Sequence, residues 1–537
     1  MSIIRGNIVD VVNKRIYKGE IHFTDKIEKI VEKDVSENEY IMPGLVNAHV
    51  HIESSMLSPS AFSKYAIKHG TVAVVSDPHE IANVCGISGL NYMLENAQQS
   101  PLKIFYGVPS CVPATSFETS GAHLDSKIVE QLLSSNHYTM LSEMMNFPGV
   151  VSHDAEVWAK INASKKYNKP IDGHAPQLTG DDLKKYVAAG ISTDHECSTL
   201  QEAIEKINLG MKIIIREGSA AKNFDTLSPL IEQFPENIMF CTDDSHPDDL
   251  LDGHINKILQ RAWKLNFNYF NVLRAATLIP IYHYNLPVGL LQANDNADFV
   301  VSNNANLDII QAVYINGKNQ INWAYKNDTV STINSWNPAT LSPSDLQISP
   351  TNKNIHVISC ADGQLLTEDA IIPYASIFDE QQKLKYGYDK IVVINRYHPA
   401  KPTVGIIKNV NLRKGAFGGT IAHDSHNIII TGHDDESIIS VFHQLCKTHG
   451  GIAAVLNDNA MLLPLPIGGL MTDDDAFIVS AKYKQLQTWV REILGSTLNA
   501  PFMTLSFMAL LVIPELKISD KGLFNILSFN YVPLIKD

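Results

Sequence analysis

The spacing of apolar residues changes once in the first part of the chain, near Pro43. Up to about residue 41 the sequence alternates in short runs, such as IIRGNIVDVV and RIYKGEIHF, with the period of half-buried β-strands. After Pro43, apolar runs of strand length alternate with helical patterns, which predicts βαβ units and a parallel sheet. We therefore expect an α/β fold that begins with a small β part.

Eight strand-length runs between Gly44 and Asp244 predict a (β/α)8 TIM-type barrel. They are GLVNAHVHIE, TVAVVSDPHE, KIFYGVPS, YTMLSEMMN, KPIDGHAP, ISTDHE, KIIIREGS and IMFCTDD. The intervening helices carry end signals: Thr199 and Glu202 form a predicted capping box, and Gly210 ends that helix. A doubly wound sheet is the alternative, but eight consecutive units favour closure.

After the barrel, the pattern returns to short strands at 287–303 and 308–318, which we expect to pair with the N-terminal strands. Residues 333–345 are rich in Ser, Asn and Pro and predict a linker. The predicted organisation is a small β-domain built from both flanks, a metal-dependent barrel and a C-terminal α+β domain. Their ranges are 1–43 plus 285–332, 44–284 and 346–537.

Composition and net charge limit the kinds of molecule that this protein is expected to bind. The 537 residues include 45% hydrophobic and 19% charged residues, enough for more than one core. A net charge of -14 argues against a nucleic-acid or anionic-membrane surface and favours a small neutral or cationic ligand. The longest apolar stretch, 502–514, is too short to span a bilayer. Six scattered cysteines and an N-terminus without a signal-peptide core predict a cytoplasmic protein.

Polar residues gather at the C-terminal ends of the predicted strands, where a TIM barrel places its active site. His49 and His51 are two apart on the first strand, so both project from one face. Alone, such a pair is more often two ordinary histidines. Four further strand ends favour a metal site instead, since they carry Glu143, His174, His195 and Asp243. Four imidazoles and two carboxylates suffice for two metal ions with one bridging carboxylate, and this ligand set suits Zn, Mn or Fe.

Two such metals would lower the pKa of a shared water toward neutrality and generate hydroxide for attack on an electrophilic carbon. Asp243 would accept the proton and deliver it to a leaving amine. The alternative for Asp243 and Asp244 is a solvated turn or helix cap, which a position at the end of the eighth strand disfavours.

The motif PGLVNAHVHIESSM resembles the first-strand metal motif of the amidohydrolase superfamily. Further motifs resemble the bacterial adenine deaminase family over almost the whole chain. They are SDPHEIANVCG, PSCVPAT, LSEMMNFPGV, DGHAPQLTG, DHECST, REGSAAKN, CTDDSHP, AHDSHNIII, LPLPIGGLM and PFMTLSFMALLVIPELKISDKGLFN. Asn47 departs from the family pattern, which has an acidic residue there, and QANDNADFV lacks the usual Pro-Gly turn.

The resemblance implies hydrolytic deamination of adenine to hypoxanthine and ammonia, a purine-salvage reaction in which metal-activated hydroxide attacks C6. It implies a binuclear Mn2+ or Fe2+ centre, with Zn2+ as an alternative, and adenine and water as partners of an expected homodimer. It also implies an acidic bridging ligand on the fourth strand, here Glu143, where other amidohydrolases often use a carboxylated lysine.

Arg216, Glu217 and Ser219 end the seventh strand. We hypothesise that Glu217 is the hydrogen-bond partner and acid for adenine N1, because it has no assigned metal role. An Arg216–Glu217 ion pair that shapes the loop is an equally good interpretation. Asp244 and Ser219 are further candidates for contacts to substrate or to the ligands.

A second acidic and histidine group occupies the first two strand ends: Glu53, Asp77, His79 and Glu80. These side chains would hold an additional metal, orient His49 and His51, or contact substrate. For Asp77 and Glu80, capping of the helix that begins in DPHEIAN is the alternative. In the last domain, His423, Asp424, His426 and Asn427 look metal-like, but a hydrogen-bonded turn is favoured.

Two other functions compete with adenine deamination. A cyclic-amide hydrolase of the hydantoinase or dihydroorotase type would share the barrel and metals, but Glu143 and the long C-terminal domain speak against it. A metal-free scaffold is disfavoured because all six ligand candidates are present.

Overall fold

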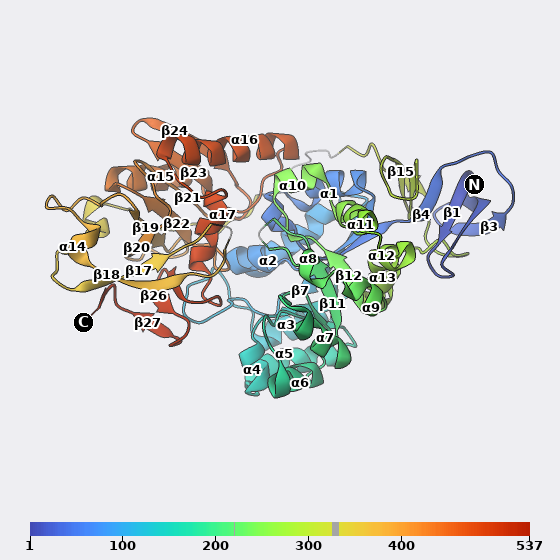
Figure 1. The fold of residues 1–537 in the computed structure, drawn as a ribbon, viewed down its shortest axis with the longest axis horizontal. Coiled ribbons are helices and arrows are strands. Elements are labelled where there is room, and N and C mark those ends of the chain that lie inside the picture. Colours follow the sequence, from blue (N-terminus) through green and yellow to red (C-terminus); the bar gives the residue numbers. More distant parts are fainter. Residues whose placement is uncertain (220, 325–331, 363, 537) are drawn as a thin grey trace. The chain divides into compact units, whose positions relative to one another are not determined.

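The computed structural model describes residues 1–219, 221–324, 332–362 and 364–536, which divide into two compact units (Figure 1). The first comprises Met1–His79, Met93–Cys111 and Leu124–Val330, and the second comprises Glu80–Tyr92, Val112–His123 and Ser331–Asp537. Two short segments within the predicted barrel range are thus grouped with the second unit. Residues 325–331 of the predicted small β-domain lie outside the described residues.

The described part of the first unit contains a closed barrel of eight parallel strand positions. The strands are β5 (Leu45–His51), β6 (Thr71–Ser76), β7 (Lys103–Val108), β8 (Tyr138–Met144), β9 (Ile171–Gly173), β10 (Thr193–Asp194), β11 (Lys212–Arg216) and β12 (Ile238–Cys241). They pair in chain order, with an Ile171–Ile191 bridge joining β9 to the β10 segment. The short β13 (Asp243–Asp244), directly after β12, pairs with β5 and closes the ring. The predicted TIM-type barrel is confirmed.

Helices connect these strands, as the sequence predicted. The main ones are α1 (Pro59–Lys68), α2 (His79–Ala97), α3 (Ser126–Leu133), α5 (Ala155–Lys166), α6 (Gly180–Ala188), α7 (Leu200–Asn208), α11 (Ile255–Lys264), α12 (Tyr269–Ala275) and α13 (Leu278–Tyr284). Short helices α4 (Phe147–Val151), α8 (Phe224–Leu227), α9 (Leu230–Gln233) and α10 (Pro247–Asp252) complete the connections.

The predicted capping box of α7 forms only in part. The Thr199 hydroxyl accepts the Glu202 amide, as expected, and Gly210 lies beyond the helix with a φ of 101°. The Glu202 carboxylate, however, accepts the amides of Ser198 and Gln177 in place of the Thr199 amide. The reason is tertiary, because Gln177 belongs to the loop after β9.

A mixed sheet joins both flanks of the barrel sequence, as predicted. Its order is β16-β15-β14-β4-β1-β2-β3, with β1 (Ser2–Asp10), β2 (Arg15–Phe23), β3 (Ile27–Glu32), β4 (Tyr40–Pro43), β14 (Phe299–Ser302), β15 (Ile310–Ile315) and β16 (Lys318–Asn319). Phe23 and Phe299, from opposite flanks, pack edge to face in its core with ring centroids 5.1 Å apart. Burial of such aromatic pairs holds the flanks together.

The second unit is α+β, as predicted. Its main sheet has the order β18-β17-β20-β19-β22-β21-β23-β24, with β28 (Ile535–Lys536) beside β17. The bounds are β17 (Asn354–Ser359), β18 (Glu368–Pro373), β19 (Tyr388–Ile394), β20 (Thr403–Lys408), β21 (Ala416–Gly419), β22 (Ile428–Gly432), β23 (Gly451–Leu456) and β24 (Asn459–Pro464). Further elements are α14 (Tyr374–Ile377), α16 (Ala476–Trp489), α17 (Pro501–Ser506), β25 (Leu516–Ser519), β26 (Gly522–Asn525) and β27 (Asn530–Val532).

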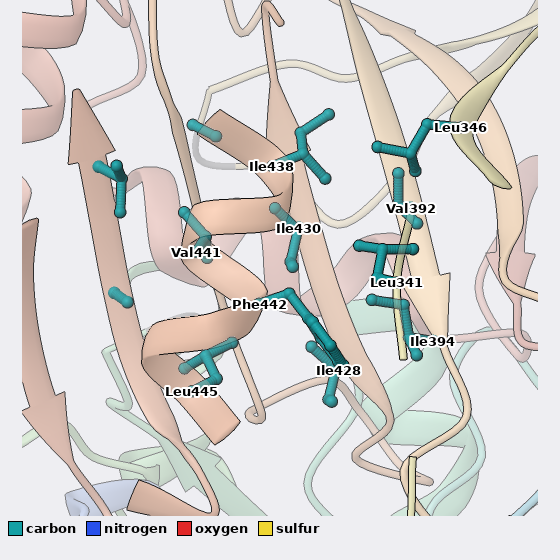
Figure 2. Packing of buried hydrophobic residues seen from close by; sticks show 13 residues of the cluster. Leu341, Leu346, Val392, Ile394, Ile428, Ile430, Ile438, Val441, Phe442 and Leu445 are labelled. Atoms are coloured by element: carbon teal, nitrogen blue, oxygen red, sulfur yellow. The ribbon is translucent and has the colours of Figure 1, made fainter. Parts of the chain in front are cut away.

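Helix α15 (Asp435–Thr448) covers this sheet through one apolar face. Figure 2 shows Ile438, Val441, Phe442 and Leu445 of α15 against strands β19 and β22. Asp434 directly precedes the helix and caps it, because its carboxylate accepts the Ser437 amide. Among the described residues, no helix is both long and apolar enough to cross a bilayer.

Asn47, which departs from the family pattern, joins β5 to the end of β12 inside the barrel. Its Oδ1 accepts the Thr242 amide at 3.2 Å, and its Nδ2 donates to Thr242 Oγ1 and to His254 Nε2, at 2.7 and 3.0 Å. His254 Nε2 is therefore an acceptor, and Nδ1, 2.7 Å from Thr71 Oγ1, carries the proton. Burial lowers the pKa of His254 to about 3.

This geometry predicts an acid sensitivity of the barrel. Between pH 6.5 and 3 the unfolded chain binds a proton at His254 that the folded chain does not. The free energy of unfolding is therefore highest above pH 6.5 and decreases as the pH is lowered from 6.5 toward 3. The expected loss between pH 6.5 and 5 is about 2 kcal/mol. The variant His254→Gln keeps one donor and one acceptor but cannot titrate. Thermal unfolding of metal-free protein should show a shallower acid decline for the variant; parallel curves would refute the assignment.

Candidate metal centre

Two histidines of strand β5 begin the site. His49 and His51 lie on the same side of the strand, with their Nε2 atoms 3.2 Å apart, and both are buried. His51 Nδ1 lies 3.0 Å from the backbone oxygen of Asp77. Since a carbonyl only accepts, Nδ1 carries a proton, and Nε2 is directed into the barrel mouth. This is the usual orientation of a metal-binding histidine.

Glu143, at the end of β8, lies at the centre of the histidines. Its Oε1 is 3.2 Å from His51 Nε2. Its Oε2 is 2.9 Å from His174 Nδ1 and 3.2 Å from His195 Nε2. The two oxygens of one buried carboxylate thus face two different sets of imidazoles.

Asp243, in β13, closes the cluster from the other side. Its Oδ1 lies 3.1 Å from His51 Nε2 and 3.4 Å from His49 Nε2. Its Oδ2 accepts a hydrogen bond from Arg216 at 2.6 Å. The structure therefore brings together all six residues that the sequence singled out at the strand ends.

The electrostatics of the cluster depend on mutual neutralisation. Burial acts to raise the pKa of Glu143, but hydrogen bonds from His174, His195 and His51 outweigh it, and the pKa lies well below its usual value. The pKa of Asp243 is likewise lowered despite burial, chiefly by the charge of Arg216. Both carboxylates are therefore ionised, the form that binds metal ions.

This donor set fits a pair of divalent ions. Imidazole nitrogens and carboxylate oxygens suit Zn, Mn and Fe. Glu143, His174 and His195 form one group whose ligand atoms lie within 4.8 Å of one another, and His49, His195 and Asp243 form another. In such a centre Glu143 would be the ligand shared by both ions, since each of its oxygens faces a different group of histidines.

The acidic and histidine residues at the first two strand ends are divided between the two units. Asp77 and His79 extend the cluster: His79 Nδ1 is 3.2 Å from Asp77 Oδ2 and 3.5 Å from Glu143 Oε1. Glu53 is buried in a short 3-10 helix (Ile52–Ser55) beyond β5. The residue that begins α2 is Pro78, which makes no side-chain cap, and Asp77 Oδ2 lies instead beside His79 Nδ1.

Glu80 belongs to the second unit, where it faces two histidines. Its carboxylate oxygens lie 3.8 Å from His423 Nδ1 and 3.7 Å from His426 Nε2. His426 Nδ1 accepts the Ala422 amide at 3.2 Å, so the neutral ring carries its proton on Nε2. The His426 amide in turn donates to Ala422 O at 2.7 Å. This is the hydrogen-bonded turn that the sequence favoured; Glu80, His423 and His426 nevertheless also form a candidate metal-binding group, with ligand atoms within 4.8 Å of one another.

Arg216 and Glu217 do not pair with each other. Arg216 binds Asp243 and both oxygens of Glu196, so the predicted Arg216–Glu217 ion pair is wrong. Glu217 instead accepts a hydrogen bond from Arg261 at 2.7 Å. It lines a cavity of about 170 Å3 with Thr242 and His254 on its walls. The lining of that cavity contains none of the six clustered residues.

The remaining predicted residues shape the loops after β11 and β13. The Ser219 hydroxyl donates to Asp249, and its amide donates to the backbone oxygen of Asp244 at 2.7 Å. The Asp244 carboxylate accepts from the Ser54 hydroxyl at 2.6 Å. These bonds join the ends of β5, β11 and β13 around the cluster.

Glu196 is a site residue that the sequence reasoning missed. Its Oε1 lies 3.5 Å from His195 Nε2 and 3.7 Å from His174 Nδ1. Strand alternation would direct it away from its neighbour His195, but β10 ends at Asp194, so the alternation does not continue. The only indication of Glu196 in the sequence is that it is an acidic residue directly after His195.

Two family models match the chain. The amidohydrolase family matches residues 40–320, and the adenine deaminase C-terminal domain matches residues 364–530. A protein of Methanosarcina barkeri named adenine deaminase is 48% identical, over 99% of each chain. Others so named are 45% identical in Borreliella afzelii and 46% identical in Sulfurovum sp., over 98% of this chain and 99% of the relative in both cases. The chain therefore belongs to the adenine deaminase family within the amidohydrolases.

Proposed function

We propose that this chain hydrolyses adenine to hypoxanthine and ammonia, and so acts on a cyclic amidine C–N bond. The observation that carries the proposal is the cluster of four imidazoles and two carboxylates around Glu143. Full-length relatives named adenine deaminase support the substrate. Adenine and water are then the two reactants.

The amidohydrolase family implies a divalent metal in the active site. We propose two ions, Mn2+ or Fe2+, with Zn2+ as the alternative. His49, His51 and Asp243 would hold one, His174 and His195 the other, and Glu143 would bridge them. When bound, the ions would lower the pKa of a shared water to near neutrality and so supply the nucleophile.

Asp243 is the proposed base. Its carboxylate is ionised, and Arg216 fixes Oδ2 so that Oδ1 faces the histidines. As the water oxygen bonds to C6, Asp243 would take its proton and pass it to the exocyclic amine. The C6–N bond then breaks, ammonia leaves, and the ring is left as hypoxanthine.

Adenine N1 must gain a proton, or a strong hydrogen bond, as C6 becomes tetrahedral. Glu217 remains our proposed acid, and burial raises its pKa, which favours the protonated form, although Arg261 opposes the shift. Glu196 is a second candidate because its carboxylate lies beside His195. Arg216 fixes the position of that carboxylate and neutralises its charge.

The alternative functions have less support. A cyclic-amide hydrolase of the hydantoinase or dihydroorotase type is not favoured, because relatives matching nearly the full chain are named adenine deaminase. A scaffold without catalysis is disfavoured by the ionised, clustered ligand candidates. We also propose a homodimer in the cytoplasm, which light scattering and cell fractionation test.

The first prediction concerns substrate and metal together. Metal-free protein should be inactive, and two equivalents of Mn2+ or Fe2+ per chain should restore conversion of adenine to hypoxanthine with one ammonia released. Ultraviolet absorbance of the purine and an ammonia assay measure this. Turnover of dihydropyrimidines without adenine turnover would refute the proposed substrate.

Asp243 is predicted to be indispensable. The variant Asp243→Asn loses a base and a ligand, so kcat should fall by at least about 1,000-fold, a combined proton-transfer and metal effect. Asp181→Asn is the matched control, because the side chain of Asp181 is 87% exposed and pairs only with Lys184 among the ion pairs of the described residues. An Asp243→Asn enzyme within tenfold of wild type would contradict the proposal.

The role of Glu217 is tested through two carboxylates that share Arg261. Glu217→Gln should lower kcat by about 100-fold or more, the usual contribution of a general acid, with both metal equivalents retained. Asp225 also pairs with Arg261 but is exposed, so Asp225→Asn should leave kcat unchanged. If Glu217→Gln keeps full kcat and its metal, Glu217 is not the acid.

A further inference from the structure

Behind His174 and His195, a fully buried lysine of helix α7 holds two carboxylates. Lys206 is 0% exposed, as is Asp194, and Glu202 is 3% exposed. The Lys206 ammonium donates to Asp194 Oδ2, to Glu202 Oε1 at 2.7 Å and to Ala175 O at 2.7 Å. An ammonium has three donors, so each of its hydrogens has an acceptor.

Asp194 joins the two histidine-bearing loops. It is the last residue of β10, directly before His195. Its Oδ1 accepts the amides of Ala175 and Glu196, both at 3.2 Å. These are the residues that follow His174 and His195 in the chain. One carboxylate oxygen thus binds the backbone next to both histidines.

Glu202 repeats this connection one step further along both loops. Its Oε1 accepts the Gln177 amide at 2.8 Å, and its Oε2 accepts the Ser198 amide at 3.1 Å. Two carboxylates therefore each connect the loop after β9 to the loop after β10. Glu202 and Lys206 are four residues apart on α7, so one face of that helix presents both.

We propose that Lys206, Asp194 and Glu202 are positioning residues that set the spacing of His174 and His195 for the metal ion which these histidines share with Glu143. The inference rests on the proposed metal assignment. The arrangement depends on the Lys206 ammonium, because without it two ionised carboxylates would lie close together in a dry interior, at a high electrostatic cost. The loops would then separate or take up water.

A purely structural ion pair makes a different prediction. Such a pair would stabilise the barrel whether or not metal is bound, and its loss would lower the melting temperature without changing metal affinity in the folded protein. A positioning role acts on the geometry of the ligands, and loss of groups that orient ligands typically costs 10–100-fold in metal affinity.

The test is a Mn2+ titration of metal-free protein against a chromogenic chelator, with the metal-free melting temperature measured in parallel. In Lys206→Met, one of the two Mn2+ equivalents should bind 10–100-fold more weakly while the other is unchanged. Saturating Mn2+ should restore kcat to within several-fold of wild type. Unchanged affinity for both equivalents in the folded variant would overturn the proposal.

Lys517 is the matched control, because it is also 0% exposed and donates to two backbone oxygens, those of Leu365 and Phe507, in the second unit. Lys517→Met should alter the melting temperature but neither Mn2+ affinity. If Lys206→Met does not fold, Glu202→Gln gives the same test with a smaller expected loss, about 3–10-fold, and unchanged affinity again overturns the proposal.

His174→Ala separates this proposal from the ligand assignment. It should lose the same Mn2+ equivalent that Lys206→Met weakens. A His174→Ala protein that keeps both ions would overturn the assignment of His174, and the positioning proposal with it. If His174→Ala loses one ion while Lys206→Met retains both at full affinity, only the positioning proposal fails.

Discussion

A buried carboxylate that stays ionised is the constraint on which this site depends. Glu143 is 3% exposed, and burial alone would favour its neutral form. Three histidines within hydrogen-bonding distance reverse that preference. The histidines therefore have to be kept close together, and the barrel does this by placing each at the C-terminal end of a different strand.

The groups around the cluster each compensate a charge or direct a lone pair. Arg216 neutralises Asp243 and Glu196, and the backbone of Asp77 fixes the protonated nitrogen of His51. Lys206 likewise neutralises Asp194 and Glu202, which bind the loops that carry His174 and His195. These buried charges are thus paired, which is the condition for keeping them in a protein interior.

Much of this arrangement was predictable, because it follows from local periodicity. The run GLVNAHVHIE specifies a buried strand with two histidines on one face, and seven similar runs specify the rest of the barrel. A residue at the C-terminal end of a barrel strand lies at the mouth of the barrel, so the six ligand candidates could be named before their distances were known. Closure by β13 then brought Asp243 to His49 and His51.

Partner choice among charged residues was not predictable in the same way. Arg216 and Glu217 are neighbours in sequence, yet Arg216 binds Asp243 and Glu217 pairs with Arg261, because Arg216 is the last residue of β11 and Glu217 already belongs to the following loop. Glu202 has the position of a capping-box residue but binds an amide of the adjacent loop. Glu196 became a neighbour of His195 only because β10 ends one residue earlier.

The sequence alone determined the class of fold, the family and the set of candidate ligands, since these depend on periodicity and on motifs read along the chain. Only the tertiary structure decided how the charges are paired, which carboxylates hold the two loops together, and that residues 80–92 and 112–123 are grouped with the second unit. The physical reason is the distance along the chain over which each property acts. Periodicity is a local property of the backbone, whereas electrostatic pairing depends on distances between segments that only folding brings together.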